Sequence, residues 1–359
     1  MSKVEAVILN TKPFRPTDYN EKAVEAVLDE TYLIADVKKD GVRLNLCVGP
    51  DAGDGEGFAV DWLSREGKAF PAIAKDSPLD GDIRWAKFFN PNLGEAMFRD
   101  EGFMLDAELV LLNAKGEEVP CKTTSGTLRR KESELPLSSL RVYVFDIVPL
   151  DVVLSGAEYE VFQCVRKMHV EYQVAKLKEY FPEIDWIVAE SYEIFSVETM
   201  PVVEREGFDE EGNEIIIKLQ PPLSLNQLYT SVRLNGEEGL VLKDPMGFYR
   251  RSKCSGWWKK VPSDNEDGIV QGPVWGTAGL ANEGKVIGFE VRLESGHVVS
   301  ACKISKAKMD EFTANELAQP GYYKGWTVRV KCMERYPDGS MRHPSFDEFR
   351  GISDPLIKE

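Results

Sequence analysis

The chain has 359 residues, of which 43% are hydrophobic and 29% charged, and its formal net charge is −16. This length allows a large core and predicts two domains, while the mixed composition excludes a disordered chain. The net negative charge argues against a protein that coats nucleic acid non-specifically. No apolar run reaches the length of a membrane span and no basic leader is visible, so we expect no membrane contact and a cytoplasmic location.

Cysteine and histidine spacing gives no sign of a structural metal site. The closest two of the six cysteines, Cys302 and Cys332, are 30 residues apart, which excludes zinc-ribbon spacing. We therefore expect free thiols in a reducing compartment. His169 lies beside a predicted helical stripe and is expected to be a packing residue rather than a metal ligand.

The first 260 residues alternate strand-like and helical segments. A helix is expected within 17–30, and a longer one over 157–181, where Val161, Val165, Met168 and Tyr172 recur at spacings of four, three and four. An acidic hairpin is expected at 204–222, around "EEGNE". Strand patterns cover 32–49 (strand, Asp-Gly turn, strand), 58–73, 102–112, 140–150, 237–249 and 255–262.

Beyond residue 261 short strands alternate with Gly-rich turns, with one helical patch near 307–318. A small all-β barrel of about a hundred residues fits this pattern. The polar stretch "PSDNEDG" at 262–268 marks the predicted boundary, so we expect domains at 1–261 and 262–359. The predicted fold class is α+β.

A basic segment interrupts the acidic chain. From Lys243 to Val261 there are six basic residues against one acid, Asp244, which gives a local charge of +5. This density indicates a confined polyanion site, such as one for a triphosphate or for the phosphates of one nucleic-acid strand. A solvated basic loop is the alternative.

Six segments resemble, in their order, the motif series of covalent nucleotidyltransferases, which comprise DNA ligases, RNA ligases and mRNA capping enzymes. They are "KKDG" with Arg43 (38–43), "SREGK" (64–68), "LDAEL" (105–109), "VYVFDIVPL" (142–150), "EEGLVLKD" (237–244) and "SGWWKK" (255–260). The blocks "GLVLKDP", "SGWWK", "GLANEGKVIGFEV" and "RHPSFDEFRG" are similar to the compact ATP-dependent DNA ligases of podovirus-type bacteriophages, and the likeness covers nearly the whole chain. It implies a two-sheet nucleotidyltransferase (adenylation) domain followed by an OB-fold domain.

Lys38 matches the nucleophile of this family and would form a lysine–AMP phosphoramide. A lysine amine attacks phosphorus only when it is neutral, a form that cationic neighbours and partial burial favour. Lys39 stands at a variable position, alternates to the other face of the strand and is expected to be solvated. With Val37, it is nevertheless counted among the residues that flank the nucleotide.

The resemblance assigns further nucleotide contacts. Arg43 and Arg65 would hold phosphate and ribose through forked donors, with surface ion pairs as the alternative. Glu108 would accept the ribose hydroxyls, and Phe145 would stack on adenine. Asp36 stands where the family commonly has a Glu that reads the adenine amino group.

The last two motifs contribute a carboxylate and lysines. Glu238 would bind Mg²⁺, a cation that prefers oxygen ligands, whereas Lys243 and Lys259 would grip the α-phosphate. The family often has a second lysine two residues after Lys259, where this chain has Val261. Lys260 would point to the opposite face of a regular strand, and only a β-bulge would bring it into the site; we favour the regular strand.

The implied function is that of an ATP-dependent DNA ligase that uses ATP and Mg²⁺ to seal 5′-phosphate/3′-hydroxyl nicks in duplex DNA during replication, repair and recombination. ATP is favoured over NAD because the N-terminal nicotinamide-binding segment and the four-cysteine zinc module of the NAD branch are missing. A monomer is expected. An RNA ligase, a capping-type guanylyltransferase and a non-catalytic OB-fold binder of nucleic acid are the alternatives.

Arg342 and Arg350 resemble the terminal motif of the family, which orients pyrophosphate.

Overall fold

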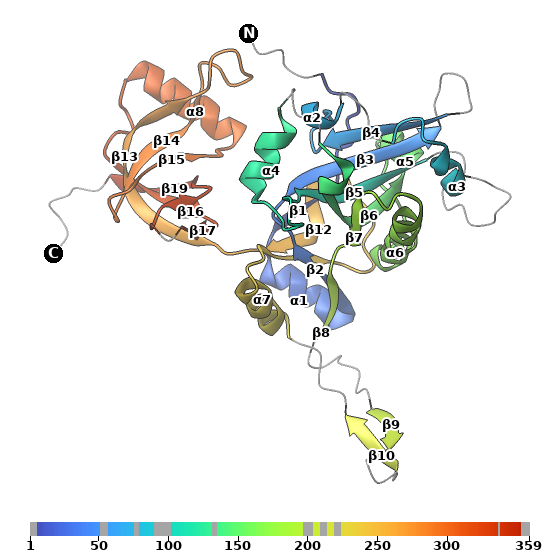
Figure 1. Cartoon of the computed structure of the whole chain (residues 1–359). Helices are drawn as coiled ribbons and strands as arrows, with labels where there is room; N and C mark the ends of the chain where they lie inside the picture. The colour runs from blue at the N-terminus through green and yellow to red at the C-terminus, as the bar shows by residue number, and fades with distance from the viewer. Residues whose placement is uncertain are drawn as a thin grey trace. The chain divides into compact units, whose positions relative to one another are not determined.

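The computed structural model describes residues 6–50, 57–74, 79–89, 102–130, 135–196, 204–208, 214–218, 224–336 and 338–352. The chain divides into two compact units, residues 1–260 and 261–359 (Figure 1). The first unit contains two five-stranded sheets, and the second contains a closed barrel. The α+β fold class predicted from the sequence is confirmed.

One sheet of the first unit carries most of the lysines of the predicted site, and we name it the lysine sheet. Only the pair β1–β12 is parallel; the other neighbours are antiparallel. In sheet order, its strands are β1 (Arg15–Asp18), β12 (Lys253–Lys260), β11 (Gly239–Lys243), β2 (Tyr32–Lys38) and β8 (Ser191–Phe195).

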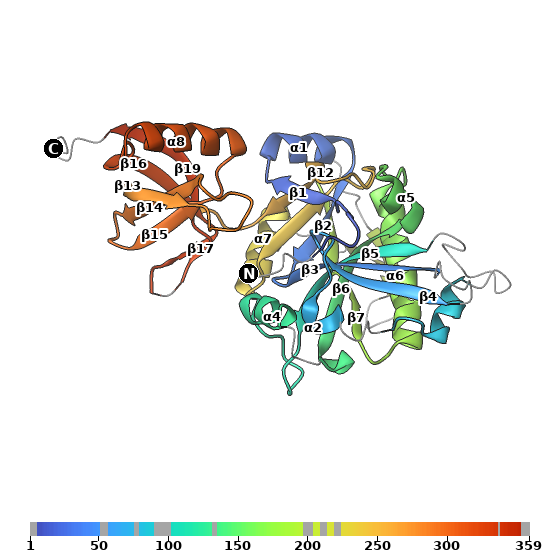
Figure 2. The same cartoon turned by 90° about the horizontal axis from the view of Figure 1, so that it is seen from above.

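Helices α1 (Glu21–Glu30) and α7 (Leu225–Leu234) cover one face of the lysine sheet (Figure 2). Both begin at capping side chains: Asn20 accepts a hydrogen bond from the Ala23 N–H, and Ser224 forms a reciprocal capping box with Gln227. Strand β2 is buried over most of its length, and alternate residues face different layers. Val37 packs into the core beneath the helices, so Asp36 and Lys38 face the opposite side.

The second sheet carries the buried carboxylates of the predicted site, and we name it the carboxylate sheet. All its neighbours are antiparallel except β6 and β7. In sheet order, its strands are β4 (Phe58–Ser64), β3 (Val42–Pro50), β5 (Phe103–Leu111), β6 (Leu140–Pro149) and β7 (Asp185–Val188).

Helix α6 (Gln163–Tyr180) packs against the carboxylate sheet and ends before Pro182, as predicted. The apolar stripe that predicted this helix does not form its buried face, because Met168 is 61% exposed and Tyr172 is 40% exposed. The buried face instead includes Arg166, which forms a fully buried ion pair with Asp146 of β6. A charged residue on the inner face is invisible to a hydrophobic pattern, which explains the error.

Short elements complete the first unit. Strands β9 (Glu204–Phe208) and β10 (Glu214–Lys218) form an antiparallel hairpin, which confirms the hairpin expected there. The remaining helices are α2 (Pro71–Ala74), α3 (Ala86–Phe89), α4 (Cys121–Leu128), α5 (Leu150–Ser155) and the 3₁₀ turns η1 (Ile83–Trp85) and η3 (Leu137–Ser139).

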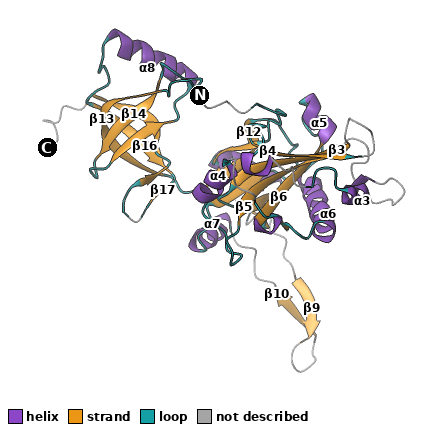
Figure 3. Cartoon of the chain, turned by 45° about the horizontal axis from the view of Figure 1, so that its top comes forward, coloured by secondary structure: helices purple, strands orange, loops and turns teal. Residues whose placement is uncertain are grey.

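The second unit is a closed five-stranded barrel with a helix packed against its core (Figure 3). Helix α8 (Lys306–Ala318) confirms the helical patch and inserts Phe312 among the core residues. In barrel order, the strands are β13 (Asp264–Trp275), β14 (Val286–Leu293), β15 (Val298–Cys302), β19 (Ser345–Ile352) and β16 (Trp326–Cys332), beside a short ladder of β17 (Glu334–Arg335) and β18 (Met341–Arg342). Most of the polar segment 262–268 belongs to β13.

All six cysteines are free, as expected. None of the helices in the described part of the chain combines the length and the apolar character needed to cross a bilayer.

Candidate active site

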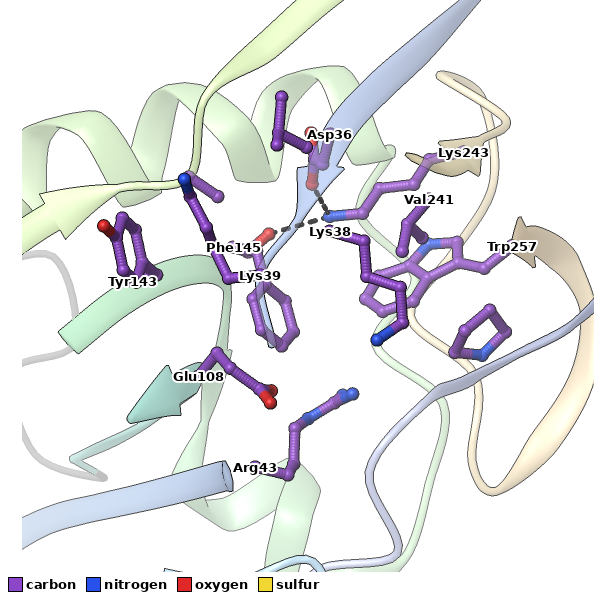
Figure 4. A pocket seen from close by; sticks show the side chains of 13 residues that line it. Asp36, Lys38, Lys39, Arg43, Glu108, Tyr143, Phe145, Val241, Lys243 and Trp257 are labelled. Atoms are coloured by element: carbon purple, nitrogen blue, oxygen red, sulfur yellow. Dashed lines mark hydrogen bonds and ion pairs between the residues drawn. The ribbon is translucent and has the colours of Figure 1, made fainter. Parts of the chain in front are cut away.

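A cavity lies between side chains of the two sheets of the first unit, with about 540 Å³ of empty space that includes solvent at its open side (Figure 4). Eight of the eleven residues predicted for the site line it, and Arg65, Lys259 and Glu238 do not. The complete lining is Pro16, Asp36, Val37, Lys38, Lys39, Arg43, Glu108, Tyr143, Phe145, Ala189, Val241, Lys243 and Trp257.

The Asp-Gly turn after Lys38 carries the chain from the lysine sheet to the carboxylate sheet, since β2 and β3 belong to different sheets. Only glycine fits at position 41, because a Cβ there would lie 2.7 Å from the Leu109 carbonyl oxygen and 2.8 Å from Cγ of Glu108. The Gly41 N–H donates to Glu108 Oε1 at 3.2 Å. The turn thus fixes Lys38 and Glu108 close together.

Lys38 forms an ion pair with Glu238, its Nζ lying 2.5 Å from Oε2. Strand β11 brings Glu238 there, because Gly239 is the cross-strand partner of Lys38. The Lys38 side chain is 25% exposed and that of Glu238 only 9%. Figure 4 shows that Lys38, Arg43 and Glu108 point toward one another across the cavity.

Burial raises the pKa of Glu108 to about 7, and the nearby Glu238 carboxylate adds to the rise, whereas Lys38 and Arg43 oppose it. Glu108 is therefore partly protonated near neutral pH. A carboxyl group in this state both donates and accepts hydrogen bonds, as recognition of hydroxyl groups requires.

The expectation that Lys39 is solvated is wrong. Its side chain is only 13% exposed, less than that of Lys38, and it forms a close ion pair with Glu237. Its ammonium group also lies 5.1 Å from the centre of the Tyr143 ring. Strand alternation does point it away from Lys38, but the carboxylate sheet covers that side.

Arg43 is held by the buried carboxylate of Asp106 through two hydrogen bonds of 2.6 Å, donated by Nε and Nη2. Tyr249 donates a further hydrogen bond of 2.6 Å to Asp106, and Asn45 donates one of 2.9 Å. Burial and the Asp106 charge raise the pKa of Tyr249, which keeps it a donor. The ion pair of Arg43 is thus internal, contrary to the surface pair considered as the alternative.

Lys243 is the most buried charged residue of the cavity lining. Lys243 is 1% exposed and lies 2.6 Å from Asp36 Oδ2, 3.0 Å from the Phe145 carbonyl oxygen and 4.3 Å from the Trp257 ring centre. Phe145 is the extra residue of a β-bulge, because pairing passes from Asp106–Asp146 to Ala107–Val144. Such bulges re-aim a side chain, and here Phe145 lines the cavity.

Two of the predicted contacts lie elsewhere. Arg65 is in the exposed turn after β4, where it pairs with its neighbour Glu66 and is 53% exposed. Lys259 is the cross-strand partner of Val241 and therefore lies on the side of the sheet that faces the cavity. Its ammonium group, however, pairs with Asp18 at 3.0 Å.

The regular strand predicted at Lys259 and Lys260 is confirmed, because the pairing of β11 with β12 proceeds without a shift. Lys260 lies on the opposite face, 4.1 Å from the ring centre of Tyr19. An irregularity occurs only earlier in β12, against β1.

Sequence reasoning missed several lining residues that were within the quoted motifs. Trp257 is the first tryptophan of "SGWWKK", and Tyr143 stands two residues before Phe145 in "VYVFDIVPL". Asp106 does not line the cavity but holds Arg43 there; it alternates with Glu108 on β5, so spacing by two could have placed it on the same face. Pro16 lines the cavity without any sequence signal.

No cluster of three or more His, Cys, Asp or Glu side chains suited to a metal occurs within the described residues. Glu238 and Glu108 nevertheless interact beside Lys38. Mg²⁺ typically uses one or two carboxylates together with substrate phosphates and water, so Glu238 fits the predicted ion.

The basic residues predicted near the C-terminus are paired within the second unit. Arg342 Nη1 donates to Glu334 Oε1 at 2.7 Å. Arg350 lies 3.6 Å from Asp267 Oδ1. The structure therefore gives each arginine a local acidic partner.

Comparison with known proteins assigns the family. The sequence model of the ATP-dependent DNA ligase domain matches residues 16–224, and that of the DNA ligase C-terminal domain matches residues 262–321. The DNA ligase of Escherichia phage T7 is 39% identical over 392 aligned positions, covering 96% of this chain and 98% of that protein. The chain belongs to the ATP-dependent DNA ligases.

Two further relatives agree. The DNA ligase of Enterobacteria phage T3 is 40% identical and covers 97% of this ligase and 98% of its own length. The solved structure of the ATP-dependent DNA ligase from bacteriophage T7 in complex with ATP is 41% identical, covers 95% of this chain and 99% of that one, and has a TM-score of 0.59. These findings confirm DNA ligase over the RNA ligase, capping and non-catalytic alternatives.

Proposed function

We propose that this ligase seals nicks in duplex DNA between a 5′-phosphate and a 3′-hydroxyl, through an AMP carried on Lys38. The observation that supports this most directly is the position of Lys38, which lines the cavity with Glu108 and Arg43 and forms an ion pair with Glu238. We assign the adenylation chemistry to the first unit and DNA binding to the barrel, with the ligase acting as a monomer.

In the first step, Nζ of Lys38 attacks the α-phosphorus of ATP. A nitrogen–phosphorus bond forms, the bond to the bridging oxygen breaks, and pyrophosphate leaves. Nζ loses two protons in all, one when the ammonium becomes the attacking amine and one as the nitrogen–phosphorus bond forms. Oε2 of Glu238, 2.5 Å away, is placed to accept the first and pass it to solvent, and the second also leaves to solvent. Arg43, already oriented by Asp106, faces the phosphates with the free side of its guanidinium group.

In the second step, the 5′-phosphate of the nick takes AMP from Lys38, whose amine is released. The 3′-hydroxyl then attacks the activated phosphate, which forms the phosphodiester bond and releases AMP. Bound Mg²⁺ supplies positive charge against the phosphate oxygens. Glu238 would hold it, and Glu108, which lines the same cavity as Lys38, would contact the ribose hydroxyls.

The part of the cavity between Phe145 and Asp36 suits the base. Phe145 offers a ring for stacking, and Asp36 offers a carboxylate oxygen to the adenine amino group. Lys243 contacts both residues, so we assign it the role of fixing this end rather than the direct phosphate grip predicted from the sequence.

The test is to incubate the ligase with α-labelled ATP, α-labelled GTP or labelled NAD, and then with nicked DNA or nicked RNA duplexes. We expect a protein–AMP adduct from ATP and sealing of nicked DNA. Efficient labelling from NAD, or preference for GTP, would overturn the nucleotide assignment. Sealing of RNA but not of DNA would overturn the substrate. Light scattering of the eluted protein tests the monomer.

A further inference from the structure

We propose that Lys39 is a positioning residue that clasps the two sheets together beside the nucleophile and thereby holds Glu238 against Lys38. The inference rests on the proposed function, in which Lys38 carries AMP. It concerns a side chain that stands at a variable position of the family motif and that the sequence placed beside the nucleotide without a chemical role.

Lys39 is held on two sides at the rim of the cavity. Its ammonium group is paired with Glu237, which precedes β11 of the lysine sheet, and lies 5.1 Å from the Tyr143 ring centre on β6 of the carboxylate sheet. Tyr143 is itself fixed, since its hydroxyl donates a short hydrogen bond to Glu118, which also accepts one from Arg141. Lys39 therefore connects the two sheets through contacts that do not involve the nucleotide.

The two lysine–glutamate pairs are coupled by sequence adjacency. Lys38 pairs with Glu238, and Lys39 pairs with Glu237. Because adjacent side chains share one main chain, Glu237 cannot shift without carrying Glu238. Arg233 of α7 secures the same segment, donating to the Glu237 carbonyl oxygen at 2.6 Å and to that of Glu238 at 3.3 Å.

The position of Glu238 matters for chemistry because small displacements of reacting groups strongly lower rates. The ion pair itself matters less for overall stability, because the Glu237 side chain is 28% exposed and exposed ion pairs add little to the free energy of unfolding. A variant that removes the charge of Lys39 should therefore fold normally and react slowly.

The experiment measures the rate of protein–AMP formation in a single turnover as a function of ATP concentration. Lys39→Met keeps the aliphatic stem and removes the charge. We expect the rate at saturating ATP to fall about tenfold or more, with little change in the ATP concentration that gives half of that rate. Lys39→Arg should restore most of the rate, because it keeps both the ion pair and the contact with the Tyr143 ring.

A double-mutant cycle tests the coupling. Glu237→Gln should slow adenylation as Lys39→Met does, and the double variant should be no slower than either single variant. Lys285→Met, which breaks a lysine–aspartate pair in the barrel, is the matched control and should adenylate at the normal rate.

Three results would overturn the inference: an unchanged rate in Lys39→Met, an effect on half-saturation alone, which indicates direct phosphate binding by Lys39, or additive losses in the cycle. Failure of the proposed function looks different. In that case Lys38→Ala would still form the adduct, whatever Lys39→Met does.

Discussion

The two sheets that enclose the cavity hold their charged side chains in different ways. On the lysine sheet, Lys38 and Lys259 each pair with a single carboxylate, and their ammonium groups remain partly exposed. On the carboxylate sheet, Asp106 is fully buried and accepts hydrogen bonds from Arg43, Asn45 and Tyr249.

This difference separates movable charge from fixed charge. A lysine that must lose a proton, bond to phosphorus and later release AMP needs an end that can reorient. A guanidinium that only has to face phosphate benefits from a rigid partner, since less rotamer entropy is lost when it binds. We therefore expect substitutions of Lys38 and Lys259 to damage chemistry while sparing the fold, and substitutions around Asp106 to damage stability as well. Lys243 of the lysine sheet, which is 1% exposed and paired with Asp36, belongs with the second group.

The sharpest test on the lysine sheet is Lys38→Ala. We expect complete loss of the protein–AMP adduct, because no other described amine lies between Glu238 and Glu108, and a thermal midpoint close to that of the unaltered ligase. Labelling with α-labelled ATP followed by denaturation measures the first quantity, and calorimetry measures the second. Label retained by the variant after denaturation would show that another residue is the nucleophile.

The matching test on the carboxylate sheet is Asp106→Ala. Removing one partner of a buried ion pair leaves the other charge uncompensated, so we expect the free energy of unfolding to fall by about 3–5 kcal/mol. Asp18→Ala is the control from the lysine sheet, since Asp18 pairs with Lys259 and its side chain is 75% exposed. We expect that loss to be about 0.2–1 kcal/mol. Denaturant unfolding of both variants measures the contrast, and equal losses would contradict it.

The sequence predicted most strands of both sheets because their patterns are local, but it did not predict β1, β7 or β8. The turn after Lys38, the strand at Phe145 and the order of the motifs can all be read along the chain. The position of Glu238 beside Lys38 was not readable in this way, since it depends on the pairing of β11 with β2 across some two hundred residues. Only the family resemblance placed both residues in one site.

The wrong predictions have the same physical cause: each depended on contacts that the local sequence does not show. Lys39 was expected in solvent because alternation says which face a side chain takes but not what covers that face. Arg65 was expected at the nucleotide, yet its turn packs against the N-terminal segment, where the Ile8 N–H donates to the Gly67 carbonyl oxygen. The spacing of Met168 suggested that it belongs to a buried stripe. The prediction was wrong because Arg166, a charged residue, occupies the inner face of α6.

A pH-dependent contrast should appear at Glu108 of the carboxylate sheet. Its pKa of about 7 in the folded protein lies above the value near 4.3 of an unburied Glu. Between these values the folded state binds more protons than the unfolded state, so the contribution of this group to stability falls as pH rises from about 4.5 to about 7. Glu108→Gln removes the titration. The thermal midpoint of this variant should therefore rise relative to that of the unaltered ligase as the pH increases from 5 to 7.5. An offset that is the same at both pH values would contradict the raised pKa.

The smallest expected effects distinguish two neighbouring lysines of β12 in the lysine sheet. Lys259 shares the row of Val241 and Asp36, on the cavity side, whereas Lys260 shares the row of Leu240 and Val37, on the helix side. The difference between the two faces should appear in transfer of AMP from the adenylated ligase to a nick, measured in a single turnover. Lys259→Ala should slow it by about tenfold, which corresponds to one partly exposed charge directed at phosphate. Lys260→Ala removes a cation from beside Tyr19, outside the cavity, and should change the rate by less than about twofold.

Because the two variants remove the same side chain from adjacent positions of one strand, each controls for the other. A defect in Lys260→Ala as large as that in Lys259→Ala would mean that the strand rearranges when DNA binds, so that both lysines reach the phosphates.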